Sequence, residues 1–368
     1  MTHRPHRLLP LLALLGTLLV GCDGNDGAAT LRTPSKFYGV IPQGAPPTPR
    51  DVQTMGKGGV GTLRFLVQWG AVQFQADACC NWSQVDDEVG AAAANGIQAL
   101  PYVYGTPGWV NDTPGSAPIQ TKAERRAWKK LLTALVQRYG RGGTYWTNPT
   151  LYEAQHPDAP PVPVTAVQIW NEQNSPVFWK PRPNPAQYGR LLKISHEAIR
   201  AASPSMKILD GGMFFSPAKR TAIHADRFLQ RLYKVKGVKK AFDIAAVHPY
   251  AGSIGGVTAQ IELMRKVMRK AADGNTKLWV TEIGWSSRGP KSNPIIKNPK
   301  GQAQMLTKAF TLLRDKRTQW HIAGVNWYSW RDVSPSQAPC QFCYGSGLLS
   351  KDGKPKPAWG AFKRFTGA

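Results

Sequence analysis

Acidic residues are scarce in this sequence, in which 22 Asp and Glu stand against 47 Lys and Arg and give a formal net charge of +25 at pH 7. The scarcity excludes an acidic, solvating protein and indicates a chain that works beside something anionic. Charged residues make up only 19% of the chain and hydrophobic residues 42%, with 13 Trp, which argues against intrinsic disorder.

Long apolar runs and internal repeats are also missing. Beyond the N-terminus no apolar run reaches about 18 residues, so we expect no transmembrane helix there. We find no P-loop, no HExxH motif and no Ser-centred nucleophile elbow. Their absence weakens the case for nucleotide, zinc-hydrolase or serine-hydrolase chemistry.

The N-terminus carries the pattern of an export signal. Arg4 and Arg7 form a basic start, and an apolar stretch over residues 8–20 follows it. Gly21 and Cys22 come next and resemble a bacterial lipobox, in which the Cys is lipidated and becomes the mature N-terminus. We therefore expect an exported protein that Cys22 anchors to the cell membrane, with plain secretion as the alternative.

Eight short β-rich segments alternate with helical patterns along the rest of the chain. The expected strands cover residues 37–41, 60–67, 97–103, 165–170, 207–211, 242–247, 277–281 and 323–328. The expected helices cover residues 49–57, 83–95, 121–139, 185–202, 220–236, 257–272, 301–316 and 358–365. Ser83 and Thr121 each precede an acidic residue by three positions, as in a capping box.

Eight strand–helix units predict a single α/β domain, a (β/α)8 TIM barrel. A doubly wound sheet is the alternative, but no GxGxxG follows the first strand. The expected organisation is a signal peptide over residues 1–21, a flexible tether over 22–36 and a catalytic barrel over 37–368.

Two of the seven Glu residues occupy a special position. Glu172 and Glu282 fall just past the fourth and seventh expected strands, where barrels carry their functional groups. The others fall in helical patterns or in a Pro-rich loop, and we expect them on solvated faces: Glu88, Glu124, Glu153, Glu197 and Glu262. Two carboxylates that face each other across a barrel mouth suit the cleavage of glycosidic bonds.

The segments Ile169 to Asn174 and Trp279 to Trp285 surround the two Glu residues. They resemble the strand-four and strand-seven motifs of the clan A glycoside hydrolases. The resemblance covers about residues 36–368, with similarity to the cellulase-like family five and the xylosidase-like family thirty-nine. Further segments that resemble the clan are Leu63 to Phe65, Val247 to Tyr250, Trp327 to Trp330 and Gly347 to Trp359.

The resemblance implies a retaining mechanism that needs no metal and no other cofactor. Glu172 is then the acid/base and Glu282 the nucleophile, with carboxyl groups about 5–5.5 Å apart. Arg64 would keep Glu282 ionised, and Asn171 would hydrogen-bond the sugar 2-hydroxyl.

Further site residues follow from the same resemblance. Tyr250 would donate to Glu282, His248 would contact sugar or carboxylate, and Trp330 would stack on the sugar. Other aromatic residues near strand ends that could contact sugar, with core packing as the competing explanation, are Trp69, Tyr104, Trp109, Phe178, Trp179 and Trp285.

Four cysteines remain beside Cys22, and an even number in an exported chain favours disulfides over a zinc site. Cys79 and Cys80 follow the second strand, and Cys340 and Cys343 follow the eighth. Because these loops are close in a barrel, we expect two disulfides that cross between them, with a local Cys340–Cys343 bond as the alternative.

The expected function is hydrolysis of a poly- or oligosaccharide. The alternative is a cell-surface barrel that binds glycans without turnover. The basic clusters fall mostly on the expected outer helices and show no nucleic-acid-binding module, so we expect no nucleic-acid partner. The sugar, the linkage and the oligomeric state stay open.

We predict that Cys22→Ser releases the protein from membranes, because it removes the lipid attachment site. Cell fractionation and the mass of the mature N-terminus check this. An unchanged membrane fraction without lipid mass on the wild-type N-terminus would contradict it.

Overall fold

The computed structural model describes residue 1, residues 33–215 and residues 221–368. The predicted export segment, Cys22 and most of the predicted tether lie outside these residues. So does residue 220, at the start of the helix expected over 220–236. Among the described residues, no helix combines the length and the apolar character that a membrane crossing requires.

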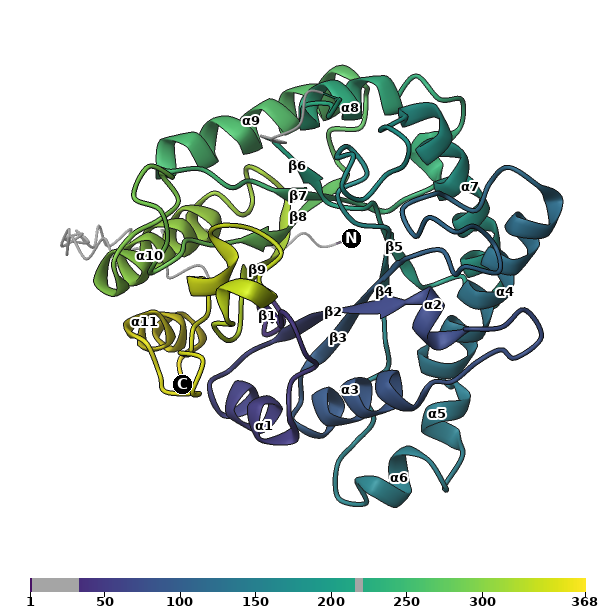
Figure 1. Ribbon diagram of the computed structural model, residues 1–368, viewed down its shortest axis with the longest axis horizontal. Helices are drawn as coiled ribbons and strands as arrows, with labels where there is room; N and C mark the ends of the chain where they lie inside the picture. The colour runs from purple at the N-terminus through teal and green to yellow at the C-terminus, as the bar shows by residue number, and fades with distance from the viewer. Residues whose placement is uncertain (2–32, 216–220) are drawn as a thin grey trace. The chain divides into compact units, whose positions relative to one another are not determined.

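The described strands run parallel and form a closed barrel with helices around it (Figure 1). They are β1 Tyr38–Ile41, β2 Thr62–Gln68, β3 Gln98–Tyr104, β4 Ala166–Ile169, β5 Lys207–Leu209, β6 Met213–Phe214, β7 Ile244–His248, β8 Lys277–Ile283 and β9 Ile322–Tyr328. The ring follows chain order, and it closes where Leu209 of β5 pairs with Ile244 of β7. Because β6 continues the fifth position along β7, the ring has eight strand positions, and the predicted (β/α)8 fold is confirmed.

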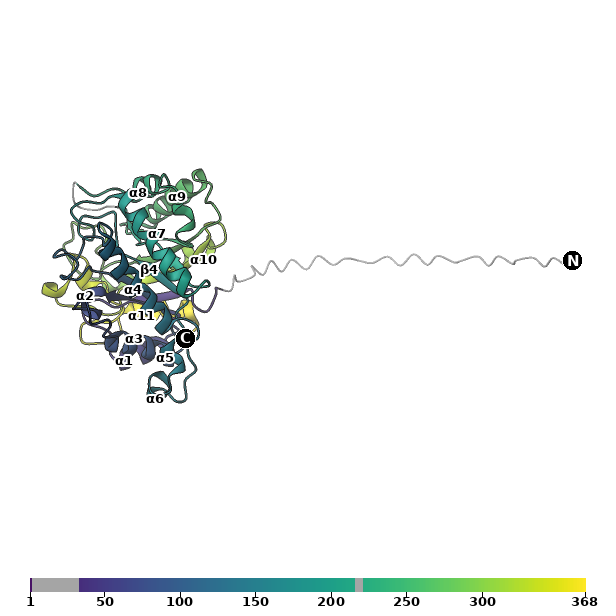
Figure 2. The ribbon, with the colours of Figure 1, turned by 90° about the vertical axis from the view of Figure 1, so that its right-hand side faces the viewer.

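The described α-helices cover the outside of the ring, and α4 and α7 lie side by side there (Figure 2). They are α1 Pro49–Lys57, α2 Trp69–Val72, α3 Ser83–Ala94, α4 Lys122–Tyr139, α5 Thr144–Thr147, α6 Tyr152–Gln155, α7 Pro185–Ala202, α8 Ala225–Leu232, α9 Ile254–Lys270, α10 Pro299–Asp315 and α11 Pro357–Thr366. Short 3-10 turns cover Val238–Lys240, Pro335–Gln337 and Cys343–Gly345. The three short helices α2, α5 and α6 have no counterpart in the sequence prediction.

Capping residues set where several helices begin. Thr48 caps α1, since its hydroxyl accepts from the backbone N–H of Asp51 at 3.2 Å and the Asp51 carboxylate accepts from the Thr48 N–H at 3.0 Å. The capping box expected at Ser83 is not formed, because the Asp86 carboxylate instead accepts from Arg138 of α4 at 2.6 Å.

The hydrophobic core fills the space between the strands and the helices. Ile244 to Val247 of β7 are all buried, as expected for a parallel strand that is covered on both faces. Trp128 of α4 is fully buried, and its Nε1 donates to the Ser195 hydroxyl of α7 at 2.8 Å. This bond fixes two neighbouring helices in register.

The barrel interior is partly polar near β1. Gly39 of β1 lies beside the buried side chain of Asn326, and a Cβ at position 39 would overlap Asn326 and lie 2.5 Å from the carbonyl oxygen of Thr62. Asn326 cannot easily move away, because its Oδ1 accepts from Trp279 Nε1 at 2.8 Å. The close approach of these strands therefore requires glycine.

We predict that Gly39→Ala lowers the free energy of unfolding by about 1–3 kcal/mol, the usual cost of overpacking a core. The matched control is Gly360→Ala in α11, where nothing lies within 4 Å of the new Cβ. A helical Gly→Ala change of this kind stabilises by roughly 0.5–1 kcal/mol. Thermal unfolding followed by circular dichroism measures both, and an unchanged midpoint for Gly39→Ala would contradict this close packing of the strands.

Candidate active site

A cavity of about 1250 Å³ opens at the carboxyl ends of the strands. Glu172, which follows β4, and Glu282, near the end of β8, both line it. Tyr250 beyond β7 and Tyr328 at the end of β9 line it as well. Functional groups of (β/α)8 proteins gather at this face, so the cavity is the candidate active site.

The backbone around Glu172 is held in an unusual conformation. Trp170 and Glu172 both have left-handed backbone angles, with φ of 75° and 40°. Such residues cost about 1–3 kcal/mol each and persist only where the surroundings fix them. Here the Trp170 N–H donates to the Val103 carbonyl at 2.9 Å, and the Glu172 N–H donates to the Gly211 carbonyl at 2.8 Å. These bonds aim the Glu172 side chain into the cavity.

Arg64 of β2 is fully buried and binds three side chains at once. Its Nη1 donates to Glu282 Oε1 at 2.7 Å, which is the contact expected from the sequence. Its Nη2 donates to Asn171 Oδ1 at 2.8 Å, and its Nε donates to Gln168 Oε1 at 2.7 Å. The guanidinium also lies over the ring of Tyr102, 4.1 Å from its centroid. One cation therefore positions groups from both β4 and β8.

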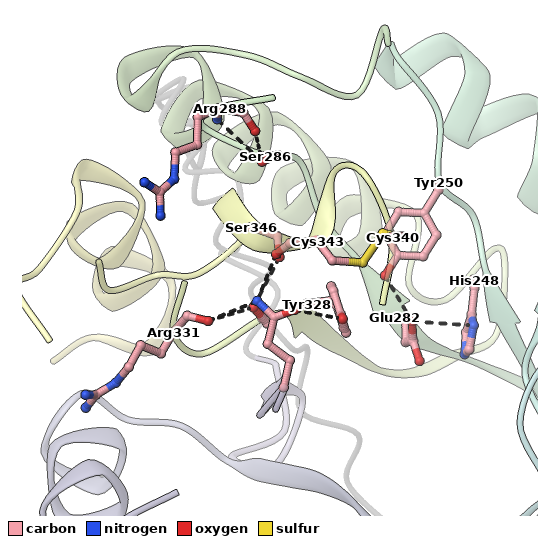
Figure 3. Close-up of a disulfide and its surroundings, with 12 residues drawn as sticks. His248, Tyr250, Glu282, Ser286, Arg288, Tyr328, Arg331, Cys340, Cys343 and Ser346 are labelled. Carbon is pink, nitrogen blue, oxygen red and sulfur yellow. Dashed lines mark hydrogen bonds and ion pairs between the residues drawn. A yellow bond between two sulfur atoms is a disulfide. The ribbon is translucent and has the colours of Figure 1, made fainter. Parts of the chain in front are cut away.

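His248 at the end of β7 and Tyr250 just beyond it lie beside Glu282 (Figure 3), and His248 also contacts Glu172. The Tyr250 hydroxyl donates to Glu282 Oε2 at 3.0 Å. His248 Nδ1 lies 2.9 Å from Glu172 Oε1 and 3.7 Å from Glu282 Oε2. The other ring nitrogen of His248 lies 3.1 Å from the Thr281 hydroxyl oxygen. The imidazole is thus held between the two acids.

The two carboxylates are close neighbours. Glu172, His248 and Glu282 each offer a ligand atom within 4.8 Å of the others. Three such groups could in principle hold a metal ion, but Arg64 already donates to one oxygen of Glu282 and Tyr250 to the other. A guanidinium 2.7 Å from Glu282 also repels a cation, so the arrangement suits a carboxylate pair better than a metal centre.

The surroundings of the two acids separate their proton affinities. Burial, together with the charge of Glu282, raises the pKa of Glu172 well above its usual value, against a smaller opposing effect of Arg64. Burial also raises the pKa of Glu282, but the charge of Arg64 and the hydrogen bonds from Tyr250 and Arg64 oppose that rise. Burial and Arg64 lower the pKa of His248, which is therefore neutral. These effects favour the protonated form of Glu172 and, through Arg64 and Tyr250, the ionised form of Glu282.

A disulfide forms part of the cavity wall (Figure 3). It joins Cys340 to Cys343, whose Cα atoms are 5.2 Å apart, and Cys79 is joined to Cys80. The cross-loop pairing expected from the sequence is therefore wrong, and the local alternative is correct for Cys340 and Cys343. The physical reason is that this loop folds toward β7, where the Phe342 ring packs 5.2 Å from that of Tyr250.

Hydrogen bonds of Gln43, two residues after the end of β1, connect the same loop to the barrel. The Gln43 side-chain amide donates to the Cys343 carbonyl at 2.8 Å and accepts from the Tyr328 hydroxyl at 2.9 Å. The disulfide loop, β1 and β9 therefore form one connected wall.

Trp330 does not line the cavity, contrary to the expectation that it stacks on sugar. It is 2% exposed, its Nε1 donates to Asp51 Oδ1 at 2.9 Å, and its ring packs against Trp359 with centroids 5.1 Å apart. The buried carboxylate of α1 turns the indole away from the site. Tyr328, two residues earlier, faces the cavity instead.

The remaining aromatic candidates divide between the cavity and the core. Phe178 lines the cavity, whereas Trp69, Trp179 and Trp285 are fully buried core residues. Trp109 and Tyr104 pack partly buried against the core and do not line the cavity. Aromatic residues that line it and that sequence reasoning missed are Phe65, Tyr102, Phe214, Tyr328 and Phe342.

Glu88 of α3 is also misplaced by the sequence prediction. It is 5% exposed rather than solvated, it lines the cavity, and its Oε1 accepts from Gln84 Nε2 at 3.0 Å. Burial raises the pKa of Glu88 to about 7. The signal was present in the sequence, because Glu88 lies on the apolar helix face of Val85, Val89 and Ala92.

Two comparisons with known proteins give matches, one to a family model and one to solved structures. A family model described as glycosyl hydrolase catalytic core matches residues 163–362. No curated protein matches the chain.

Solved structures share the fold at low sequence identity. A family 39 glycoside hydrolase from Bacteroides cellulosilyticus WH2 superposes with a TM-score of 0.66 at 20% identity, over 90% of this chain and 63% of that one. A GH5_18 variant from Bifidobacterium longum subsp. longum, in complex with Manb1-4GlcNAc, has a TM-score of 0.66 at 14% identity, over 90% of this chain and 78% of that one. A monomeric beta-xylosidase from Caulobacter crescentus CB15 has a TM-score of 0.61 at 19% identity, over 89% of this chain and 67% of that one. The chain thus spans less than two thirds of the family 39 enzyme.

We predict that Glu88→Gln stabilises the protein at pH 8 but not at pH 5. The folded-state pKa of Glu88, about 7, lies above its ordinary value, so ionising it costs folding free energy as pH rises from about 4.5 through 7. Gln at position 88 keeps the hydrogen bond from Gln84 and lacks the charge. The free energy of unfolding of the variant, relative to wild type, should rise by about 1–3 kcal/mol between pH 5 and pH 8.

Denaturant unfolding at the two pH values measures this difference. The matched control is Glu153→Gln, because Glu153 is exposed on α6. A change in the free energy of unfolding on Glu88→Gln that is the same at both pH values would contradict the raised pKa of Glu88.

Proposed function

The chain belongs to the glycosyl hydrolase catalytic core family, and on that premise we propose that it hydrolyses O-glycosidic bonds with retention of anomeric configuration. Glu172 acts as acid/base and Glu282 as nucleophile. The observation that carries the proposal is the carboxylate pair, with oxygens within 4.8 Å. Oxygens this close favour the carboxyl separation of about 5–5.5 Å in retaining enzymes over the about 6.5–9.5 Å of inverting ones.

The first step uses the opposite ionisation of the two acids. The Glu282 carboxylate attacks the anomeric carbon and forms a glycosyl ester, while the bond from that carbon to the leaving oxygen breaks. Glu172 gives its proton to the leaving oxygen. Arg64 and Tyr250 hold Glu282 by hydrogen bonds of 2.7 Å and 3.0 Å, so its carboxylate is oriented before the substrate arrives.

The second step reverses the proton transfer. Glu172, now a carboxylate, takes a proton from a water molecule, and the resulting hydroxide attacks the anomeric carbon. The ester bond breaks and Glu282 leaves as a carboxylate. Two displacements on the same carbon restore its configuration.

The neighbouring side chains have supporting roles. His248 is neutral and contacts Glu172 at 2.9 Å, so it orients the acid without adding a charge that would lower its pKa. Asn171 lines the cavity, and Arg64 holds its Oδ1 by donating at 2.8 Å. Its amide N–H₂ is left to donate to the sugar 2-hydroxyl.

The substrate is a poly- or oligosaccharide. A cavity of about 1250 Å³ exceeds the about 300–1,000 Å³ of common small-molecule sites, which supports a ligand of more than one sugar unit. The structural neighbours include a beta-xylosidase and an enzyme bound to a mannose-containing disaccharide, so β-xylosides and β-mannosides are the first substrates to test. Because Glu172 and Glu282 both line the cavity, an enzyme is favoured over a non-catalytic glycan-binding barrel.

Export is part of the proposal. We place the protein on the cell membrane through lipid on Cys22, or in the secreted fraction. The N-terminal pattern supports this, and so do the Cys79–Cys80 and Cys340–Cys343 disulfides, because disulfides persist in oxidising compartments.

We predict that Glu282→Ala abolishes turnover of every substrate, because it removes the nucleophile. Glu172→Gly should lower the rate on natural glycosides by about 10²–10⁴-fold, the usual value of general acid catalysis, and much less on 4-nitrophenyl glycosides, whose leaving group needs no proton. Gly suits position 172 because φ there is 40°.

Azide distinguishes the two roles. It should rescue Glu172→Gly with a glycosyl azide of retained configuration, and Glu282→Ala, where it rescues at all, with an inverted one. NMR of the first-formed product reads the configuration, and Glu153→Ala on the exposed face of α6 is the control. An inverted product from the wild-type enzyme, or full activity in Glu282→Ala, would overturn the assignment.

A further inference from the structure

Part of the cavity wall comes from the end of β2 and from α3, neither of which carries a catalytic acid. Gln68 at the end of β2 and Asn81, Gln84 and Glu88 in and before α3 line this part. Amide and carboxylate side chains are the groups that bind sugar hydroxyls, since together they supply both donors and acceptors. The retaining mechanism uses none of these residues.

Glu88 is directed into the cavity with one oxygen unused. A helical side chain points back toward the start of its helix, and α3 starts at Ser83 on the cavity edge. Gln84 donates to Oε1 at 3.0 Å, whereas no hydrogen bond from the described residues reaches Oε2. No Lys, Arg or His of the described chain forms a salt bridge with Glu88. Oε2 of Glu88 is not sealed from the cavity, so a bound ligand can reach it and donate a hydrogen bond to it.

The charges around the cavity point the same way. Among the described residues that line it, the charged ones are Glu88, Glu172 and Glu282, and none is Lys, Arg or His. This contrasts with the chain as a whole, whose net charge is +25. Arg64 neutralises the charge of Glu282, and Glu172 keeps its proton. Above pH 7, where Glu88 is ionised, Glu88 therefore carries the uncompensated negative charge of the cavity.

We propose that Glu88, with the amides of Gln84 and Gln68, forms a second sugar-binding subsite. This subsite accepts hydrogen bonds from the hydroxyls of an uncharged sugar unit and repels uronic acids. The proposal rests on the proposed function and names its substrate class as chains of uncharged sugars. A uronate carboxylate brought to this wall would meet Glu88 with no cation between them, and such like-charge contacts are how sites reject a wrong ligand. The basic surface of the protein then lies outside the substrate site.

Kinetics with substrates of two lengths test the subsite. A 4-nitrophenyl β-xyloside or β-mannoside has a single sugar, which occupies the cleavage position, whereas xylotetraose or mannotetraose reaches further. Glu88→Ala should leave kcat/KM for the aryl glycoside within twofold of wild type and lower kcat/KM for the tetrasaccharide at least tenfold, mainly through KM. Glu153→Ala is the matched control and should change neither. Equal losses on both substrates would mark Glu88 as merely structural and overturn the subsite.

Binding tests the charge selectivity without turnover. In the Glu282→Gln background, calorimetry should show the neutral tetrasaccharide binding at least tenfold more tightly than tetragalacturonate at pH 8. Adding Glu88→Gln should change the Kd of the neutral tetrasaccharide by no more than threefold, because Gln still forms hydrogen bonds with hydroxyls. It should reduce the ratio of the two Kd values, tetragalacturonate over tetrasaccharide, at least tenfold. Equal binding of both ligands to the parent would overturn the selectivity.

The two proposals fail separately. Hydrolysis of aryl glycosides with no effect of Glu88→Ala on the tetrasaccharide would remove the subsite and leave the enzyme. Glu88-dependent binding of the tetrasaccharide with no hydrolysis of any substrate by the wild-type protein would leave the subsite and remove the enzyme.

Discussion

The buried guanidinium of Arg64 is the contact on which the rest of the site depends. It joins Glu282 on β8 to Asn171 and Gln168 at β4, across the width of the barrel. A buried cation is tolerated only when its partners are in place, and removing one partner of such a pair costs about 3–5 kcal/mol. One residue therefore links geometry, ionisation and stability at the site, because the charge that favours the ionised form of Glu282 also positions Asn171, which lines the cavity.

The sequence was informative wherever local chemistry decides the outcome. Helix α7 spans the predicted residues 185–202, because Asn184 caps its start and Pro185 suits the first turn. Glu172 and Glu282 could be selected because they fall just past the expected apolar strands. A carboxylate is unusual at such a position unless it has a polar or charged partner. Arg64 could be paired with Glu282 only through the resemblance to a known clan, since the two are 218 positions apart.

Predictions failed where a distant residue decides the direction of a side chain. Trp330 stands in the expected motif, but Asp51, 279 positions earlier, accepts its indole N–H and turns the ring into the core. The direction of the loop that carries Cys340 and Cys343 depends on the packing of Phe342 on Tyr250, which no spacing of cysteines reveals. The wrong prediction for Glu88 has a different cause. The helical spacing of its apolar neighbours already indicated the buried face of the helix, and only the charge of Glu88 favoured an exposed position.

The Cys340–Cys343 disulfide makes the oxidation state of the surroundings part of the substrate wall. Both sulfur-bearing residues line the cavity, and Gln43 ties the same loop to Tyr328 beneath it. A chain that folds among reducing thiols would build the same barrel, with its carboxylate pair intact, since Glu282 lies in β8 and Glu172 is held just after β4. It would hold Phe342 only by packing and a few hydrogen bonds. The barrel thus supplies the reactive groups in any compartment, whereas this part of the cavity wall is closed by a covalent bond only where thiols are oxidised.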